Sequence, residues 1–298
     1  MDDNYDFFCD NGYVILKNVF SNDEIDYINN YINDLWINKD KKVVIDEYIG
    51  TDKERRTYIQ NCSNDVKNQP YKLNDLYIYD KKIRDIISKD EISCLLKKIL
   101  NDKPTIINNL NLEYGSQQDL HTDSLFMTPP KNDDGLAAIW IALEDVDSDS
   151  GPLGYYPGSH KITQFKFSNG SMHKKDDEFS SYCKYMNEKV TELNLEKKTF
   201  LPKKGDVLIW HAFLYHCGTP INNPSLTRKS MVIHYFREKD WSSTEDITPN
   251  MSYFKKNPPF VPTTEIKLLK NENYTYDNLI KIGFDRKELI EAGFTPTN

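Results

Sequence analysis

The spacing of hydrophobic residues in the first part of the chain is mainly helical. A short apolar run after Gly12 predicts a strand near the N-terminus. Ser21 and Glu24 then match a capping box, in which the serine caps a helix and the glutamate reaches back to it. Isoleucine, leucine and tryptophan follow at helical spacing, so we expect an amphipathic helix over residues 22–36.

A long polar stretch separates this helix from a second helical region. Residues 38–75 are polar and show no clear period, which predicts an irregular segment. Isoleucine and leucine then recur on one side of residues 80–101 and predict a second helical stretch.

From residue 104 onward the pattern changes to strands and turns. Apolar or alternating runs bounded by Gly, Pro, Asn and Asp occupy residues 104–115, 135–146, 151–159, 205–216 and 228–238. Helices followed by a block of strands indicate an α+β protein, with a β-sandwich or barrel core flanked by helices.

Two segments depart from the strand pattern. Residues 161–200 are polar and rich in lysine and aromatic residues, and a long insertion of this kind is typical of a lid or binding loop. The tail ends in one or two short helices, and we find no internal repeat and no low-complexity linker. We therefore predict one domain over residues 1–240, with residues 241–298 as an extension packed on it.

Composition and charge narrow the class of partner. The 38 Lys and Arg residues are outnumbered by 46 Asp and Glu residues, giving a formal net charge of −8. Such a chain has no general attraction to phosphate backbones or anionic lipid, which argues against nucleic acid as a partner. No apolar stretch approaches the roughly 20 residues that cross a bilayer, so no membrane span is expected.

Cysteine usage and the N-terminus bear on the compartment. The chain opens MDDNYDF, which is acidic where a signal peptide would be basic. Five scattered cysteines form no C-x-x-C pair and indicate free thiols in a reducing compartment. We predict a cytoplasmic protein, and the sequence leaves its oligomeric state open.

His121 and Asp123 stand two residues apart in the segment DLHTDSL. Side chains alternate in an extended chain, so these two point to one face, with Cα atoms about 6–7 Å apart. A second imidazole would complete two nitrogens and one carboxylate, a set that leaves coordination positions open and suits non-haem Fe(II). The triplet alone also fits a surface strand with two solvated polar residues.

The segment GDVLIWHAFLYHCGTP supplies a candidate for that imidazole. It joins a Gly-Asp turn to an apolar strand and then to His216, and Arg228 follows twelve residues later at the start of another strand. The planar fork of an arginine is well suited to hold a carboxylate through two parallel hydrogen bonds. By itself, Arg228 also fits a strand-edge cation paired with a surface acid.

Together these segments resemble the phytanoyl-CoA hydroxylase-like (PhyH) family of Fe(II)- and 2-oxoglutarate-dependent dioxygenases. Residues 7–29 resemble the family's N-terminal strand and helix, and HTD at 121–123 resembles its His-x-Asp motif. WIALEDVDSDSGPLGYYPGSHK at 140–161 and GDVLIWHAFLYHCGTPINNPSLTR at 205–228 resemble the segments that follow, in the family's order. The resemblance covers roughly residues 7–237.

The resemblance implies a double-stranded β-helix, or jelly roll, that uses Fe(II), O₂ and 2-oxoglutarate. Iron would be held by His121, Asp123 and His216, and Arg228 would bind the far carboxylate of 2-oxoglutarate. Halogenating relatives replace the ligand aspartate by a small residue, so the presence of Asp123 disfavours halogenation.

Other residues enter the co-substrate pocket by the same resemblance. Asn111 and Trp140 fall where the family places residues that line this pocket. Cys217-Gly218 follows the distal histidine, where the family often has Gly-Ser, and Thr219 is our candidate to supply the missing hydroxyl.

The remaining histidines are assigned other roles. His211 lies 17 residues from Arg228, farther than the family's usual gap, and is expected in the core or the pocket wall. His160 is expected in a structural turn and His173 in solvent. His234 shares strand parity with Arg228, faces the interior and is expected to be a satisfied buried histidine.

The predicted function is hydroxylation of an unactivated C–H bond of a small-molecule metabolite, with release of succinate and CO₂. Residues 38–75 and 161–200 would select the substrate. Three alternatives remain open from the sequence: a Zn or Mn hydrolase or isomerase, a non-catalytic binding module, and an oxygenase with a desaturation, epoxidation or cyclisation outcome.

Overall fold

A computed structural model of the chain describes residues 3–127, 134–241, 243–255 and 261–296. Residues 1–2 of the acidic N-terminal stretch lie outside the described residues. The helices are α1 (Asp3–Asn11), α2 (Asn22–Asn38), α3 (Lys81–Ile87), α4 (Asp90–Leu100), α5 (Phe179–Glu192), α6 (Thr263–Leu268), α7 (Tyr276–Lys281) and α8 (Arg286–Glu291). The strands are β1 (Tyr13–Leu16), β2 (Val44–Glu47), β3 (Arg55–Tyr58), β4 (Tyr71–Asn74), β5 (Pro104–Leu112), β6 (Leu136–Ala142), β7 (Leu153–Tyr155), β8 (Lys198–Phe200), β9 (Val207–His211), β10 (His216–Gly218), β11 (Ser230–Arg237), β12 (Thr244–Thr248) and β13 (Met251–Phe254).

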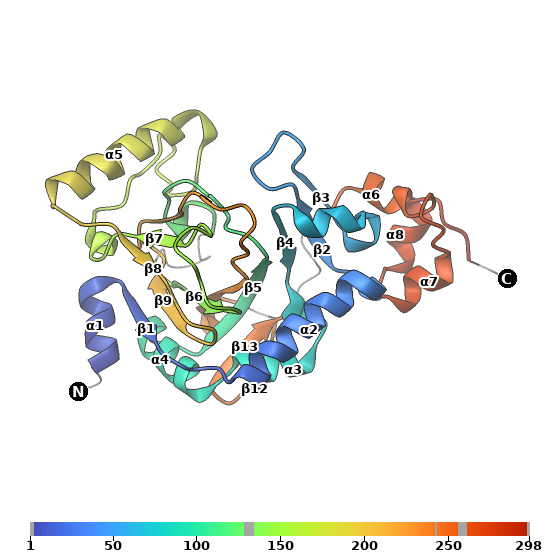
Figure 1. Cartoon of the computed structure of the whole chain (residues 1–298), viewed down its shortest axis with the longest axis horizontal. Coiled ribbons are helices and arrows are strands. Elements are labelled where there is room, and N and C mark those ends of the chain that lie inside the picture. The colour runs from blue at the N-terminus through green and yellow to red at the C-terminus, as the bar shows by residue number, and fades with distance from the viewer. Residues whose placement is uncertain (1–2, 128–133, 242, 256–260, 297–298) are drawn as a thin grey trace.

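Two β-sheets form the centre of the molecule (Figure 1). The larger sheet has the order β1-β9-β6-β11-β5-β4-β2-β3, with β13 pairing parallel to β5, while the smaller sheet has the order β10-β7-β8. Apolar side chains from both sheets, among them Trp140 and Leu208 from one and Leu153 and Phe200 from the other, form a common core. The predicted α+β architecture with a two-sheet core flanked by helices is confirmed.

The N-terminal helix prediction is confirmed in detail. α2 covers Asn22–Asn38, and the Ser21 and Glu24 side chains form the capping box with each other's backbone N–H groups. The apolar face of α2 is buried in the main hydrophobic core beneath the larger sheet.

The helical stretch predicted over residues 80–101 is two helices, α3 and α4, so the prediction of one element is corrected. α3 ends at Ile87, and the hydroxyl of the next residue, Ser88, donates to the Asp85 carbonyl. Lys89 adopts an extended conformation before α4 begins. The Lys89 ammonium donates to the Val19 carbonyl and to Glu24, which ties the break to the start of α2. Apolar residues on both sides of the break still face the same core.

The segment over 38–75 is not irregular, which is a second correction. β2, β3 and β4 extend the larger sheet beyond β5. All four residues of β2 are buried, including Asp46 and Glu47, because each carboxylate pairs with the arginine directly opposite on β3. A fully buried strand that contains two acids shows neither the alternation nor the apolar run by which strands are predicted.

The insertion over 161–200 contains α5, which lies at the periphery of the molecule (Figure 1). One face of α5, formed by Tyr182, Met186 and Val190, is buried against Leu125 and Tyr215. This contact places α5 behind the loops that lead into β10 and out of β5.

A ten-residue pattern recurs three times near the C-terminus, over 265–274, 275–284 and 285–294, which corrects the expectation of no repeat. The fifth residue of each unit is a fully buried leucine, the ninth has positive φ, and the tenth is aromatic. The aromatic residue donates its N–H to the carbonyl of the buried leucine, as in a Schellman C-cap. The second and third units share the pattern Leu-Ile-x-x-Gly-Phe, whereas the first unit has only the leucine in common with both.

These units pack on β2 and β3, two of the strands that the sequence pattern did not predict. Their leucines and aromatic rings share a core with Val44 of β2 and Tyr58 of β3. Glu265 accepts one hydrogen bond from the Thr57 hydroxyl, and Lys42 pairs with Glu288 at 2.6 Å. The tail is thus attached beside β2 and β3, and the boundary at residue 240 stays a prediction.

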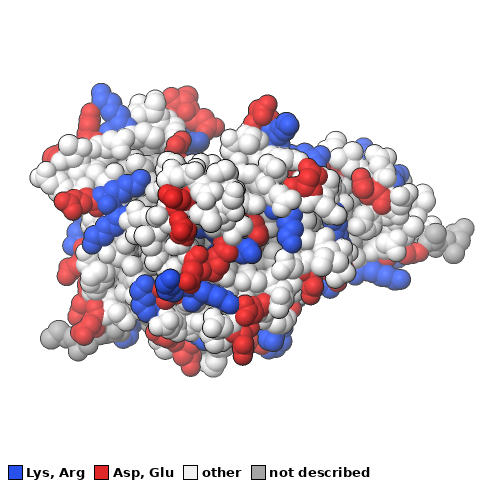
Figure 2. All heavy atoms as spheres, viewed as in Figure 1, with Lys and Arg blue, Asp and Glu red and all other residues white. Residues whose placement is uncertain are grey.

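In the described ranges, no helix is both long enough and apolar enough to cross a membrane. Figure 2 shows Lys and Arg side chains interleaved with Asp and Glu over the visible face.

Candidate active site

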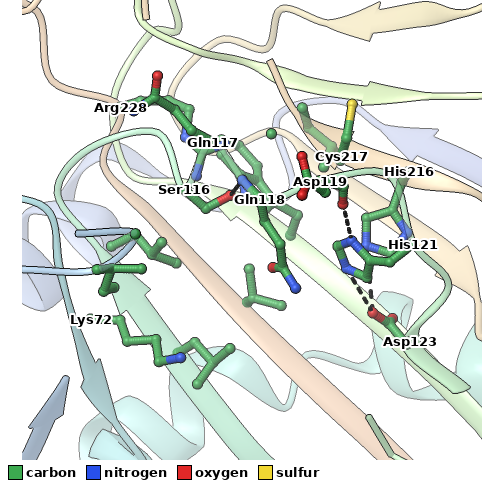
Figure 3. A pocket seen from close by; sticks show the side chains of 18 of the residues that line it. Lys72, Ser116, Gln117, Gln118, Asp119, His121, Asp123, His216, Cys217 and Arg228 are labelled. Carbon is green, nitrogen blue, oxygen red and sulfur yellow. Dashed lines mark hydrogen bonds and ion pairs between the residues drawn. The ribbon is translucent and has the colours of Figure 1, made fainter. Parts of the chain in front are cut away.

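A pocket of about 520 Å³ lies between the two sheets. The larger sheet contributes Trp140 of β6, Trp210 of β9 and alternate residues of β5 and β11, while the smaller sheet contributes β10. Loop 116–119 closes one side, and the β2–β3 loop with Lys72 of β4 lines the far end (Figure 3). None of residues 161–200, all of which the structure describes, lines this pocket.

The predicted metal ligands converge in this pocket. One ligand atom from each of His121, Asp123 and His216 lies within 4.8 Å of the others, and all three residues are buried. The Asp123 Oδ1 atom lies 3.9 Å from His121 Nε2 and 3.5 Å from His216 Nε2. Thr122 is extended, so His121 and Asp123 project to the same side, as the sequence predicted.

Local backbone contacts aim both imidazoles at the site. His121 Nδ1 lies 2.6 Å from the Asp119 carbonyl, and His216 Nδ1 lies 2.8 Å from the Leu214 carbonyl. A carbonyl only accepts hydrogen bonds, so Nδ1 is protonated in both rings and Nε2 keeps a free lone pair. His216 begins β10 rather than ending the preceding strand, and its backbone pairs with that of His121.

Electrostatics favour a neutral imidazole and an ionised acid. Burial, together with neighbouring His216, lowers the pKa of His121 to about 3. Burial alone would raise the pKa of Asp123, but His216 and then His234 lower it well below its usual range. Neutral nitrogen donors and one carboxylate are the donor set that non-haem Fe(II) prefers, so these residues fit that ion.

Two residues that the sequence did not assign to the metal site hold the second oxygen of Asp123. The Trp210 indole N–H donates to Oδ2 at 2.7 Å, and His234 Nε2 lies 3.6 Å from the same oxygen. His234 is buried and its Nδ1 contacts the Asn108 side chain at 2.7 Å, so the expectation of a satisfied buried histidine is confirmed. His234 lies six residues from Arg228, and this even spacing along a strand predicted that both side chains face the interior. No sequence signal predicted the role of Trp210.

Arg228 lies in the same pocket, on the other side of loop 116–118 from the metal ligands (Figure 3). Only 2% of its surface is exposed, and burial lowers its pKa to about 10, partly offset by Glu144. Among the described residues, its guanidinium makes one hydrogen bond, to the Gly151 carbonyl at 3.3 Å, while its Nε has no partner. Its Cζ lies 5.4 Å from the centre of the Trp140 ring.

Two predicted pocket residues are not brought to the pocket. Leu110 and Leu112 line it, so Asn111, which lies between them on β5, faces the opposite side of the sheet. The Thr219 hydroxyl donates to the Pro152 carbonyl at 2.7 Å and does not line the pocket. Trp140 does line the pocket, as the resemblance implied.

The glycine after Cys217 is explained by a close backbone contact. A Cβ atom at Gly218 would lie 2.6 Å from the Gln117 nitrogen and 2.6 Å from Ser116 Oγ. A serine at this position would require loop 116–118 to move. The close approach of this loop therefore explains why glycine stands where the family often has serine.

The other histidines lie away from the metal ligands. His211 accepts the Phe213 N–H through Nδ1, and burial, followed by the effect of His160, lowers its pKa to about 4. His160 lies in a short 3₁₀ turn over Gly12, and His173 is exposed, as expected. His216 rather than His211 therefore joins His121 and Asp123.

Comparison with known proteins gives one family. The family model described as "Phytanoyl-CoA dioxygenase (PhyH)" matches residues 8–230. A Caenorhabditis elegans protein described as "Phytanoyl-CoA dioxygenase domain-containing protein 1 homolog" is 22% identical over 81% of this chain and 93% of its own length. The mouse protein described as "Phytanoyl-CoA dioxygenase, peroxisomal" is 23% identical over 77% of this chain and 66% of its own length.

Solved structures show the same fold. The α-ketoglutarate-dependent carbocyclase SnoK from nogalamycin biosynthesis is 16% identical, with a TM-score of 0.59 over 80% of this chain and 84% of its own. EctD from S. alaskensis, solved with 2-oxoglutarate and 5-hydroxyectoine, is 13% identical, with a TM-score of 0.56 over 82% of this chain and 78% of its own. The predicted double-stranded β-helix is thereby confirmed.

Proposed function

The chain belongs to the phytanoyl-CoA dioxygenase (PhyH) family, and from this premise we propose a catalytic role for each group in its pocket. It is a 2-oxoglutarate-dependent non-haem iron dioxygenase, which uses Fe(II), 2-oxoglutarate and O₂. We assign iron binding to His121, Asp123 and His216, and co-substrate binding to Arg228. We further propose that the reaction hydroxylates a C–H bond of a small molecule.

The buried guanidinium of Arg228 carries this proposal. A charged group without a counter-ion is costly in a low-dielectric interior, so a buried cation whose Nε lacks a partner fits an anionic ligand. A carboxylate can accept two parallel hydrogen bonds from the guanidinium fork. The distal carboxylate of 2-oxoglutarate meets this requirement in the pocket that also holds the three metal ligands.

Groups of the chain itself orient the proposed ligands. Backbone carbonyls fix the rings of His121 and His216, while Trp210 and His234 occupy the Oδ2 side of Asp123 and leave Oδ1 toward the imidazoles. When bound, iron and 2-oxoglutarate supply the oxidation, in which 2-oxoglutarate is decarboxylated to succinate and one oxygen atom of O₂ enters the substrate.

The pocket wall limits the access of water. Leu110, Leu112 and Val232 line it on the side of the larger sheet, and Trp140 covers Arg228. Apolar walls exclude solvent and strengthen the pairing of a guanidinium with a carboxylate.

A small-molecule substrate fits a pocket of this size. The β2–β3 loop and Lys72 line its far end, so residues 38–75 reach the pocket as expected of a substrate-selecting segment. Residues 161–200 do not reach it. The solved relatives include an epimerase that binds nogalamycin RO, and desaturation, epoxidation or cyclisation stays an alternative to hydroxylation. The cytoplasmic location also stays a prediction.

The first prediction separates the two roles of the pocket. Anaerobic wild-type protein with Fe(II) and 2-oxoglutarate is expected to show the visible charge-transfer band of the chelate. His121→Ala should lose both iron binding and the band. Arg228→Leu should bind Fe(II) as the wild type does but bind 2-oxoglutarate at least thirtyfold more weakly, equivalent to about 2 kcal/mol, because the diacid loses its ion-pair partner.

Titration of 2-oxoglutarate into the iron-loaded variants, followed by the band, measures this difference. If the wild type shows neither the band nor oxygen-dependent release of succinate in a screen of metabolites, the proposed function is wrong. Incorporation of ¹⁸O from O₂ into the product of a positive metabolite separates hydroxylation and epoxidation from desaturation and cyclisation. Identifying the labelled group as a hydroxyl or an epoxide then separates the first two outcomes.

A further inference from the structure

The insertion over 161–200 lies behind the metal ligands instead of over the pocket. Its helix α5 contacts the two chain segments that carry all three proposed ligands. The contacts come from residues adjacent in sequence to the ligands.

The first contact is at the residue between two ligands. The Tyr182 hydroxyl donates to Thr122 Oγ1 at 3.3 Å, and Thr122 separates His121 from Asp123. Thr122 Oγ1 also lies 2.9 Å from Ser124 Oγ. The hydrogen-bond network that starts at Tyr182 therefore includes the residues on both sides of Asp123. Thr122 and Tyr182 are each 1% exposed, and burial raises the pKa of the Tyr182 hydroxyl, which stays protonated as a donor.

The second contact is at the residue before the third ligand. The Tyr215 hydroxyl donates to Asn187 Oδ1 at 3.3 Å, and His216 follows directly in the chain. The ring of Tyr215 also packs edge to face on that of Tyr182, with centroids 6.4 Å apart. Residues five positions apart on one helix therefore hold both ligand segments.

Packing makes this arrangement firm. Tyr182, Met186 and Val190 repeat every four residues and form one buried face of α5. This face is covered by Leu125, two residues beyond Asp123, and by Tyr215. A lid that opens has to expose the face it closes with, whereas this face belongs to a closed apolar cluster with no pocket-lining member.

We propose that α5 is a positioning element for the metal site, with Tyr182 and Asn187 as its positioning residues. This inference rests on the proposed iron site. Groups hydrogen-bonded to metal ligands fix their orientation, and mutation of such groups typically weakens metal binding by 10–100-fold. Tyr182 and Asn187 contact the residues next to the ligands, so we expect an effect at the lower end of this range. The insertion therefore acts on the affinity and geometry of the metal site and not on substrate entry.

Metal binding to purified full-length apoprotein tests the proposal without a substrate. We expect Tyr182→Phe and Asn187→Ala each to raise the dissociation constant for Fe(II) about tenfold, measured anaerobically. The absorption spectrum of the Co(II)-loaded protein should shift in both variants, because the ligands lose their fixed orientation. The matched control is Tyr185→Phe, which removes a hydroxyl of the same helix that donates to the Thr163 carbonyl, inside the insertion. It should bind metal within twofold of the wild type.

A double-mutant cycle separates loss of the Tyr182–Thr122 contact from general loosening of the fold. Thr122→Val removes the acceptor of the Tyr182 hydroxyl, so the Thr122→Val/Tyr182→Phe double variant should bind metal no more weakly than the weaker single variant. The positioning role is overturned if Tyr182→Phe and Asn187→Ala bind Fe(II) as tightly as the wild type. It is equally overturned if Tyr185→Phe loses as much affinity as they do. A wild-type protein that binds no metal refutes the iron site itself, a result distinct from both.

Discussion

At the scale of single residues, three imidazoles surround one carboxylate, but their surroundings differ. His121 and His216 are held by backbone carbonyls, and His234 contacts the side chain of Asn108. Backbone groups fix a ring more firmly than a side chain that can itself rotate. The first two rings face Asp123 Oδ1 and form the candidate metal site with it, whereas His234 faces Oδ2.

His211 offers a pH-dependent prediction away from the metal site. Its pKa is lowered from about 6.5 to about 4 in the fold, first by burial and then by His160. The unfolded chain therefore takes up the proton at higher pH, and the neutral ring contributes stability that is complete above about pH 6.5 and lost as the pH falls toward 4. Urea unfolding measured from pH 6.5 to pH 4 should show a smaller loss of unfolding free energy for His211→Asn than for the wild type. The Oδ1 atom of the new asparagine can still accept the Phe213 N–H.

The exposed His173 provides the control for this measurement. His173→Asn should leave the acid slope of the wild type unchanged. If His211→Asn retains that slope, His211 is not its source.

The sequence predicts individual site residues well where a short motif fixes them. His121 and Asp123 needed only the alternation of an extended chain, and the distance between His216 and Arg228 selected the histidine that lies beside them. Trp210 was out of reach because its contact with Asp123 joins positions 87 residues apart in the chain. Asn111 was wrong because the face of a strand depends on register, and a shift by one residue reverses it.

At the scale of elements, local signals were reliable when they lay within one turn. The α2 capping box was readable from four residues, whereas the end of α3 depends on Lys89 reaching Val19 and Glu24, far away in sequence. β2, β3 and β4 are four-residue strands whose polar members are neutralised by partners on a neighbouring strand. Such long-range pairing leaves no period in the sequence.

The capping box gives a prediction at this scale. Ser21→Ala should lower the free energy of unfolding by about 1 kcal/mol, because the Glu24 N–H loses its acceptor at the first turn of α2. The midpoint of urea denaturation measures the change. Ser21→Asp retains an acceptor and should stay within about 0.5 kcal/mol of the wild type, so an equal loss in both variants contradicts capping as the cause.

At the scale of the whole molecule, the main core and the core of the C-terminal units are separate clusters of buried residues. The main core lies beneath the larger sheet, and the second core joins the three C-terminal units to β2 and β3. Figure 1 shows α6, α7 and α8 grouped at one end, away from α5. The resemblance to a known family predicted the main sheet but ended near residue 237, so it carried no information on this second core.

A local-unfolding prediction follows from the second core. Leu279→Ala removes a fully buried side chain from the middle unit and should cost about 2–5 kcal/mol of local stability. Hydrogen exchange should then show faster amide exchange in α6, α7 and α8, with β6, β9 and β11 still protected.

The adjacent Ile280 is 39% exposed, and Ile280→Ala should leave the exchange pattern unchanged. If Leu279→Ala accelerates exchange equally in the central strands, the two cores unfold together and the local description fails.

The threefold decapeptide has a consequence for how this terminus can change in length. Each unit ends its helix with a residue of positive φ, followed by an aromatic residue whose N–H bonds to the leucine carbonyl. Every unit therefore ends with the same backbone geometry. Duplication of ten codons would therefore add one more turn of a small solenoid without disturbing what precedes it. Growth in such steps offers a route by which an oxygenase could acquire a longer appendage while its barrel stays intact.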